Sequence, residues 1–274
     1  MTWDEMRPLL ETATRETLSM VGIATLVALL VGLPIGVLLV LTDRGGLLRN
    51  RPVNKAVGAV VNVGRSLPFI ILMLALTSFT RWVVGTSLGW EAASVPLAVG
   101  AVPFYARLVE TSVREVDGGL VEAVQAMGGS TWTVVRKALL PEALPSLVAG
   151  LTTTVIAVVG YSAMAGTVGG GGLGTLAYTY GYMRFETDFM VVIVIELIIL
   201  VTLVQLIGDL AVRSLGQRGR GTGPVRLLRR RGAATAVTVP AQQTTPGGET
   251  PAPGSADSTG DGTAAAPASA ASPR

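Results

Sequence analysis

The sequence predicts an all-α protein, a polytopic membrane helical bundle with five transmembrane helices. Half of its 274 residues are hydrophobic and only 14% are charged, which leaves more apolar surface than one soluble core can bury. The chain has no cysteine and no histidine. This composition excludes disulfides, metal sites built from Cys or His, and histidine proton relays, and it points to no cofactor. The net charge of +3 is small, and the basic residues concentrate in a few loops. This distribution indicates that they orient the protein in the membrane rather than bind nucleic acid.

The first span is expected over residues 17–41, an apolar stretch without a charged residue. As a helix that rises about 1.5 Å per residue, it reaches past a hydrocarbon core about 30 Å thick. A cleaved signal peptide would have a basic start and a shorter apolar run, whereas residues 1–16 carry more acidic than basic side chains. We therefore expect residues 1–16 to form an extracytoplasmic N-terminal segment ahead of an uncleaved helix.

Four further apolar stretches complete the predicted permease domain, residues 17–213. They lie at about residues 56–80, 92–113, 145–166 and 188–211. The loops on one side of the five spans hold fourteen Lys and Arg residues, and the loops on the other side hold four. By the positive-inside rule, this multi-pass protein of the inner (plasma) membrane has its N-terminus outside and its C-terminus in the cytoplasm.

The C-terminal tail, residues 214–274, begins with basic residues and continues as a low-complexity segment. Beyond residue 232 it consists mainly of Ala, Thr, Pro, Gly and Ser. Such a segment cannot bury enough apolar surface to offset its ordering entropy, so we expect a disordered cytoplasmic tail. Its basic residues 226–231 are expected to meet anionic lipid headgroups.

The loop over about residues 114–145 lies on the cytoplasmic side and has the pattern of two short helices. Asp117 is placed to cap the first helix, and Leu120, Val124 and Met127 recur at helical spacing as one apolar stripe that can dock in a partner's groove. Gly128 permits a sharp turn. After it, Ser130 or Thr131 can cap a second helix, which a proline, Pro141, closes before the next span. From periodicity alone, an amphipathic helix on the membrane surface is an equal alternative.

This loop resembles the EAA loop of ABC importer permeases. The family pattern is Glu-Ala-Ala, three residues, Gly, nine residues, then Ile-x-Leu-Pro, and here it reads from Glu122 through Gly128 to Ala138-Leu139-Leu140-Pro141. Val124 and Ala138 depart mildly from the pattern. Further segments are similar to methionine importer permeases in particular, over about residues 15–213. These segments are residues 65–72, 84–87, 136–145 and 160–164.

The resemblance implies an ABC importer type I permease fold and a subunit that is not itself an enzyme. It implies a second copy of this chain, two separate ABC ATPase subunits, an extracytoplasmic methionine-binding protein and the lipid bilayer as partners, and methionine, D- or L-, as the substrate. ATPase coupling is then expected at Glu122, Ala123, Val124, Met127, Gly128, Leu140 and Pro141. The gate of the translocation path is expected at Tyr161, Ser162 and Met164, with Met164 the strongest candidate.

Nucleotide-binding motifs are either absent or out of context. Residues 169–174 satisfy G-x-G-x-x-G, but no strand precedes them and they fall in an outer loop, so we interpret them as a tight turn with close backbone packing. The chain contains no G-x-x-x-x-G-K-[ST] motif. If it is part of a pump, the energy source is therefore another polypeptide.

Two charged residues interrupt predicted spans. Arg65 and Glu196 lie within the second and fifth spans, where an unpaired charge costs roughly 3 kcal/mol. One hypothesis pairs them with each other. The alternative is that Arg65 faces an aqueous inner vestibule or caps carbonyl groups freed by Pro68, while Glu196 is partly protonated or meets another helix.

Three other functions remain as alternatives. An ABC permease for another amino acid or small polar nutrient would share the coupling loop. An ion-coupled secondary transporter or channel is disfavoured because it has no use for such a loop and because few intramembrane carboxylates are found. A static membrane scaffold is disfavoured by Gly, Pro and Ser breaks within the spans.

Overall fold

The computed structural model describes residues 3–219, with side chains described up to residue 215. Every regular element in this part of the chain is helical, as predicted. In chain order the elements are α1 (Trp3–Val27), η1 (Ala28–Gly32), α2 (Leu33–Thr42), α3 (Arg51–Ser66), α4 (Phe69–Ala75), α5 (Thr77–Val84), α6 (Trp90–Arg114), α7 (Gly118–Ala126), α8 (Thr131–Val134), η2 (Val135–Leu139), α9 (Leu140–Gly166), α10 (Gly172–Leu176), η3 (Ala177–Met183) and α11 (Thr187–Gly219), where η marks a π-helix. Residues 214–219 continue α11, and the rest of the predicted tail lies outside the described residues.

The first span belongs to a helix that is longer than expected. α1, η1 and α2 follow one another over the 40 residues Trp3–Thr42, which is a rise of roughly 60 Å against a hydrocarbon core of about 30 Å. Residues 3–16 are the first part of this helix rather than a separate segment. The expected boundary at residue 17 marks the end of the charged residues, and the helix itself begins at Trp3.

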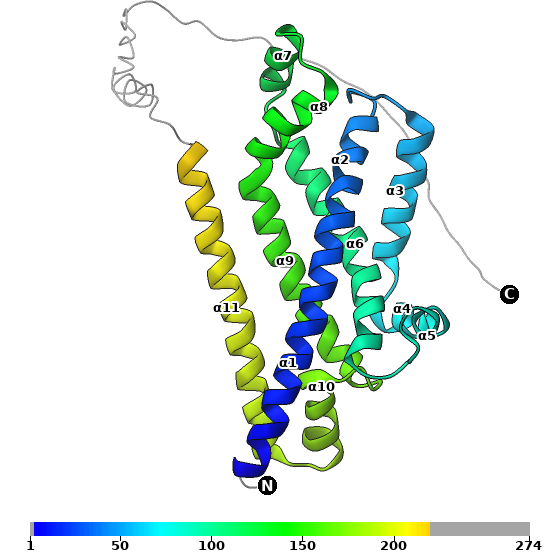
Figure 1. Ribbon diagram of the computed structural model, residues 1–274, viewed down its shortest axis with the longest axis vertical. Coiled ribbons are helices and arrows are strands. Elements are labelled where there is room, and N and C mark those ends of the chain that lie inside the picture. Colours follow the sequence, from blue (N-terminus) through cyan, green and yellow to red (C-terminus); the bar gives the residue numbers. More distant parts are fainter. Residues whose placement is uncertain (1–2, 220–274) are drawn as a thin grey trace, which may run out of the picture. The chain divides into compact units, whose positions relative to one another are not determined.

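The predicted second span, residues 56–80, is not one straight helix. α3 ends at Ser66, and α4 leaves it at an angle of 105°. The cause is Pro68, because proline disfavours helical geometry at the preceding residue and Leu67 is accordingly extended. Figure 1 shows α4 and the short α5 lying across the direction of α3.

Three further helical segments of the described chain are long and apolar enough to cross a membrane. They are Trp90–Arg114, Thr131–Gly166 and Thr187–Leu215. Together with Trp3–Thr42 they make four spans, and five if the bent pair α3 and α4 counts as one. The predicted third, fourth and fifth spans fall within these three segments.

Small residues bring the first long helix close to α6. Ala24, Ala28, Gly32 and Gly36 recur every four residues, and a Cβ atom on Gly36 would lie 2.5 Å from the carbonyl oxygen of Ala106. Helices in lipid associate mainly through such close packing, because lipid tails are as apolar as the side chains. The interior around this contact is made of fully buried side chains, among them Met20, Leu97, Tyr105, Val109 and Val158.

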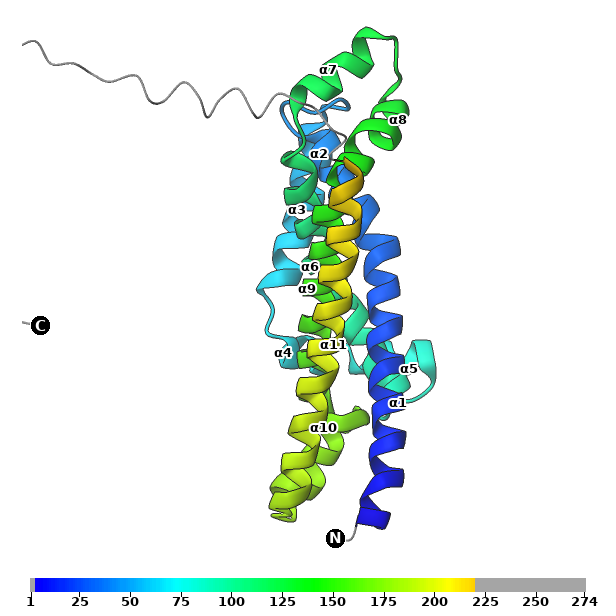
Figure 2. The ribbon, with the colours of Figure 1, turned by 90° about the vertical axis from the view of Figure 1, so that its left-hand side faces the viewer.

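This part of the chain has two ends that different short helices occupy. α7 and α8 lie at one end, and α10 lies at the other, where α1 begins (Figures 1 and 2). We call these the α7 end and the α10 end.

Candidate functional site

The helix α7 forms where the sequence predicts it, and its start is capped. The carboxylate of Asp117 accepts a hydrogen bond from the backbone N–H of Gly119 at 2.7 Å, which satisfies one of the free donors of the first turn. No residue of α7 is fully buried. Only Val121 and Val124 pack, half-buried, against the core, so most of the helix surface is open to a partner.

Gly128, which follows α7, allows the chain to turn at the end of this helix. Gly128 has φ +79°, its N–H donates to the carbonyl of Gln125 at 2.9 Å, and the N–H of Gly129 donates to the carbonyl of Val124 at 2.9 Å. These two bonds define a Schellman motif, which requires a left-handed residue at this position. The chain therefore reverses direction sharply after α7, as the sequence predicts.

The second part of the loop joins α7 firmly to α9. Ser130 caps α8 by accepting a hydrogen bond from the N–H of Thr133 at 3.3 Å. Ala138 and Leu139 are buried. The expectation that Pro141 closes the second helix is wrong, because the helical run continues from Thr131 to Gly166. The π-helix η2 lies just before this proline, and such local adjustments let a membrane helix accommodate proline. Residues 130–141 therefore form a helical and partly buried connection between α7 and α9.

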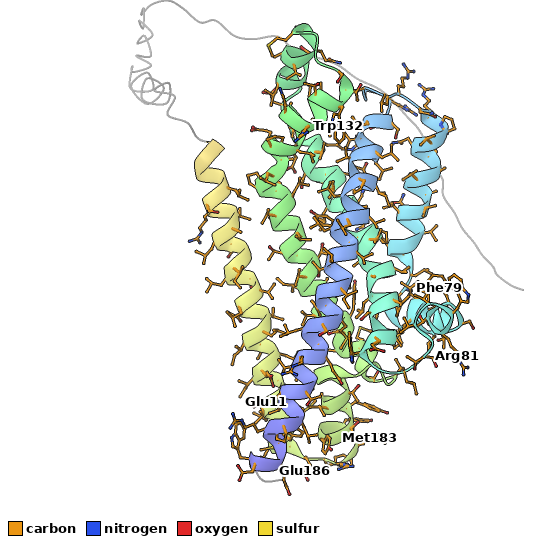
Figure 3. The ribbon with its side chains drawn as sticks, viewed as in Figure 1. Glu11, Phe79, Arg81, Trp132, Met183 and Glu186 are labelled. Carbon is orange, nitrogen blue, oxygen red and sulfur yellow. The ribbon has the colours of Figure 1, made fainter. Side chains whose placement is uncertain are left out.

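The predicted apolar stripe of α7 is divided. Leu120 and Met127 are exposed, but Val124 turns toward the core, so the stripe is not one free face. An exposed tryptophan that the sequence analysis did not single out, Trp132 on α8, lies close to this end instead (Figure 3). Glu122 and Gln125 line a groove of about 470 Å³ between α7, α6 and the α2–α3 connection.

A cluster of four charged side chains, which the sequence analysis missed, lies between α6 and the α2–α3 connection. Glu110, only 4% exposed, accepts from Arg107 at 2.6 Å and from Arg114 at 2.7 Å, and Arg114 also reaches Asp43 at 2.6 Å. Arg114 and Asp43 line the groove that holds Glu122. The Arg-x-x-Glu-x-x-x-Arg spacing within a predicted helix was the available signal, because residues three and four apart share a helix face.

The environment of Asp43 stabilises its charged form. The backbone N–H of Arg44 donates to this carboxylate at 2.7 Å, and the guanidinium of Arg114 lies on its other oxygen. First the Arg44 hydrogen bond and then Arg114 lower the pKa of Asp43 below its usual value.

The three predicted gate residues do not share one surface of the chain. The ring of Tyr161 stacks on Phe69 of α4 with centroids 4.9 Å apart. Ser162 is buried and donates to the carbonyl of Val159 at 2.8 Å, whereas Met164 is 43% exposed. Tyr161 therefore ties α9 to the broken second span, and Met164 faces away from the interior of the chain.

Arg65 and Glu196 are not brought together within one chain. Glu196 on α11 forms a hydrogen bond with the hydroxyl of Thr14 on α1. Arg65 is exposed and lines a cavity of about 150 Å³ with Tyr161 and Phe104. In the described residues the two charges have different neighbours, and Glu196 meets another helix, α1.

The glycine turn, residues 169–174, is held tightly at the α10 end. The N–H of Gly172 donates to the carboxylate of Glu16 at 2.7 Å, and the N–H of Leu173 donates to the hydroxyl of Thr17 at 2.9 Å. A Cβ atom on Gly172 would lie 2.5 Å from that hydroxyl oxygen. The interpretation of the glycines as a tight turn with close packing agrees with this geometry, since three of them also have positive φ.

Known proteins resemble this chain over most of the described residues. Residues 32–221 match the family described as "Binding-protein-dependent transport system inner membrane component". The "Probable D-methionine transport system permease protein MetI" of Vibrio cholerae is 52% identical over 210 residues, 77% of this chain and 93% of that protein. The "Methionine import system permease protein MetP" of Bacillus subtilis is 47% identical over 181 residues, 66% of this chain and 82% of that protein.

Solved structures share the fold. A chain of the MetNI methionine ABC transporter, in inward-facing conformations, superposes with a TM-score of 0.77 at 47% identity, covering 78% of this chain and 99% of that chain. A chain of an amino acid ABC transporter crystallised with histidines superposes with a TM-score of 0.64 at 18% identity, over 77% of this chain and 95% of that one. At that identity the second likeness concerns the fold alone.

Proposed function

Because this chain belongs to the family of binding-protein-dependent transport system inner membrane components, we propose that it is the membrane-spanning subunit of an ATP-driven importer of methionine. The observation that carries the proposal is the capped, largely uncovered helix α7, which is joined to α9 through α8 and η2. Its sequence carries the family's coupling motif, and the relatives named for methionine transport cover most of the chain. The chain is a transport subunit, and ATP hydrolysis belongs to a separate polypeptide.

The working assembly is proposed to contain two copies of this chain, two ABC ATPase subunits and an extracytoplasmic methionine-binding protein. The described part of the chain offers large exposed apolar faces for lipid and for the second copy. The α7 end is proposed to face the cytoplasm and the α10 end the outside. This orientation rests on the excess of Lys and Arg in the loops at the α7 end.

Transport is proposed to follow alternating access, with α7 as a lever. Closure of the two ATPases on ATP draws the two copies of α7 together, and the capped joint from Ser130 to Pro141 carries this displacement into α9. The path then opens toward the binding protein, and ATP hydrolysis reopens it toward the cytosol. Glu122, Ala123, Met127 and Gly128 are proposed to contact the ATPase, while Val124, Leu140 and Pro141 are proposed to hold the lever in place.

The gate is proposed to lie where α9 meets the broken second span. Met164 is placed at the gate because its flexible thioether is exposed on α9, and Tyr161 with Ser162 would set the position of that segment. Replacement of Met164 by Ala should change the uncoupled leak or the transport rate. A variant in which both equal the wild type removes this assignment.

Arg65 is proposed to face an aqueous vestibule, and Glu196 is proposed to join α11 to α1 through Thr14. Exchanging the two charges, Arg65→Glu with Glu196→Arg, should then fail to restore the assembly that either single substitution impairs. Restored assembly in the exchanged variant would instead support a pair between the two residues.

Uptake into sealed vesicles tests the proposed function. Vesicles that hold this chain and its ATPase, supplied with binding protein and ATP, should take up labelled methionine, and unlabelled methionine should compete better than other amino acids. Uptake that needs no ATP favours a secondary transporter. ATP-driven uptake that ignores methionine leaves an ABC permease with a different substrate.

Gly128→Pro tests the lever. Proline cannot adopt the left-handed backbone of this position and lacks the N–H that donates to Gln125, so the Schellman motif is lost. The subunit should still insert, and ATP hydrolysis should continue without uptake. Coupled transport at the wild-type ratio in this variant contradicts the lever.

A further inference from the structure

The connection between η3 and α11 presents an exposed aromatic turn, residues 182–185. Phe185 is 83% exposed and has φ +56°, and it is the one residue other than glycine with positive φ in the described chain. Tyr182 and Met183 beside it are also exposed. A bulky residue in left-handed geometry is strained and persists only when its surroundings impose it, so neither solvent contact nor backbone preference accounts for this turn.

The aromatic turn is held in one conformation by its neighbours. The guanidinium of Arg184 lies 4.6 Å from the ring centroid of Tyr180, and the rings of Tyr178 and Tyr182 stack with centroids 5.7 Å apart. The N–H of Glu186 donates to the carbonyl of Tyr180 at 3.0 Å. Side chains that already make contacts lose less entropy on binding, which suits Tyr182 and Arg184 on either side of Phe185 to recognition.

The aromatic turn lies beside the part of α1 that extends beyond the apolar stretch. Met6 and Leu10 of α1 pack in one cluster with Phe189 and Ile193 of α11. The helix from Trp3 to Thr42 is about twice as long as the hydrocarbon core is thick, and the charged residues of α1 all precede its apolar stretch. Figure 3 shows Met183 and Glu186 at this end, opposite Trp132. From this position we expect the exposed rings to lie beyond the lipid tails.

Charge distinguishes the classes of partner that could cover such a patch. Residues 3–16 and 178–188 together hold six acidic and three basic side chains. The acidic ones are Asp4, Glu5, Glu11, Glu16, Glu186 and Asp188. An acidic surface is repelled by anionic lipid headgroups and attracted by a basic protein surface.

We infer that the aromatic turn, residues 182–185, is a docking element for the extracytoplasmic binding protein and inserts Phe185 into an apolar pocket with a basic rim on that partner. This inference rests on the proposed function, which puts the binding protein at the α10 end. A large side chain that fills a pocket on the partner, surrounded by contacts that exclude water, is typical of an interaction hot spot.

Phe185→Gly tests this inference without endangering the fold, because glycine adopts positive φ freely. The assembled transporter in lipid nanodiscs is titrated with the cell's methionine-binding protein. The Kd should rise roughly 10- to 100-fold, while ATP hydrolysis without binding protein and the thermal midpoint stay equal to or above the wild type. Phe185→Asn, which also tolerates this backbone, should behave in the same way.

Two matched variants complete the experiment. Trp82→Ala removes an equally exposed aromatic side chain, 82% exposed on α5, and should leave the Kd within about twofold. Asp188→Asn should weaken binding and reduce its dependence on salt.

Each outcome of the titration has one interpretation. If the wild type binds and Phe185→Gly binds equally well, the inference is wrong while the proposed function stands. An unchanged Kd together with a lower thermal midpoint makes the turn a lipid or packing contact and also overturns the inference. A wild-type transporter that never binds the protein removes the proposed function and the inference together.

Discussion

Two glycines with positive φ, Gly128 at the α7 end and Gly172 at the α10 end, have opposite surroundings. A Cβ atom on Gly128 would meet no atom within 4 Å, whereas one on Gly172 would lie 2.5 Å from the hydroxyl oxygen of Thr17 and 2.6 Å from Cε of Met20. Gly128 is therefore required only for the backbone conformation of its own turn. Gly172 also allows the close contact between two helices that are far apart in the sequence, α1 and α10.

The same contrast holds for the elements around these glycines. α7 has no fully buried residue, while Leu173 of α10 is completely buried in the cluster that contains Phe189. The α10 end is thus fastened to α1 by packing and by hydrogen bonds to Glu16 and Thr17. The α7 end is fastened through α8 and η2, which suits a helix that moves as one body.

Gly172→Ala should have the largest effect on stability. The added methyl group clashes with Thr17 and Met20 and the backbone becomes strained, so the free energy of unfolding should fall by roughly 2–5 kcal/mol. Thermal unfolding of the purified subunit measures this effect. The matched control is Gly22→Ala on α1, where a Cβ atom meets nothing within 4 Å and alanine should be neutral or stabilising. Equal midpoints for the two variants contradict the contrast.

Glu110→Gln should have the next largest effect. It replaces a nearly buried carboxylate that neutralises Arg107 and Arg114, whose own side chains are almost half exposed. Because solvent can compensate the two arginines, we expect the free energy of unfolding to fall by about 1–2 kcal/mol rather than by the full cost of breaking a buried ion pair. Because Arg114 also lines the groove of Glu122, the ATP consumed per methionine should rise. Glu115→Gln, on an exposed neighbour, is the control and should change neither quantity.

Gly128→Ala sharpens the comparison, since only backbone strain distinguishes alanine from glycine there. The free energy of unfolding should fall by about 1 kcal/mol, which is less than for Gly172→Ala. Coupled uptake should be reduced rather than abolished. Uptake and thermal unfolding of the same preparation provide both values. A loss as large as that of Gly172→Ala means that α7 is packed more tightly than its surroundings indicate.

Asp43→Asn should have the smallest effect on stability, and this effect depends on pH. The pKa of Asp43 is lowered in the folded protein, so its contribution to stability is present above the ordinary value of about 3.8 and is lost as the pH falls through the lowered pKa. The stability advantage of the wild type over Asp43→Asn should therefore shrink as the solution is acidified below about pH 4. An advantage that is constant with pH contradicts the Arg44 and Arg114 contacts.

The spans and the turn of the coupling loop were accessible from the sequence because their causes are local. Uncharged apolar stretches predict spans, and the residue types at Asp117, Gly128 and Ser130 specify caps and a turn that need no distant partner. The break at Pro68 has an equally local cause, yet its size, 105°, depends on how α4 packs against α6 and α9. The prediction that Leu120, Val124 and Met127 form one free apolar face on α7 was wrong. Which side of a helix faces inward depends on the elements that pack against it.

The sequence by itself determined that this protein is a helical membrane subunit with a motif that resembles the EAA loop of ABC importer permeases and with no G-x-x-x-x-G-K-[ST] motif, because composition, periodicity and motif spacing are properties of the chain alone. Only the tertiary structure decided which charges meet, how the glycine turn is fastened to α1, and that Phe185 is exposed in strained geometry. Those outcomes depend on distances between residues far apart in sequence. Glu16 and Gly172, for example, become neighbours only when α1 and α10 pack together.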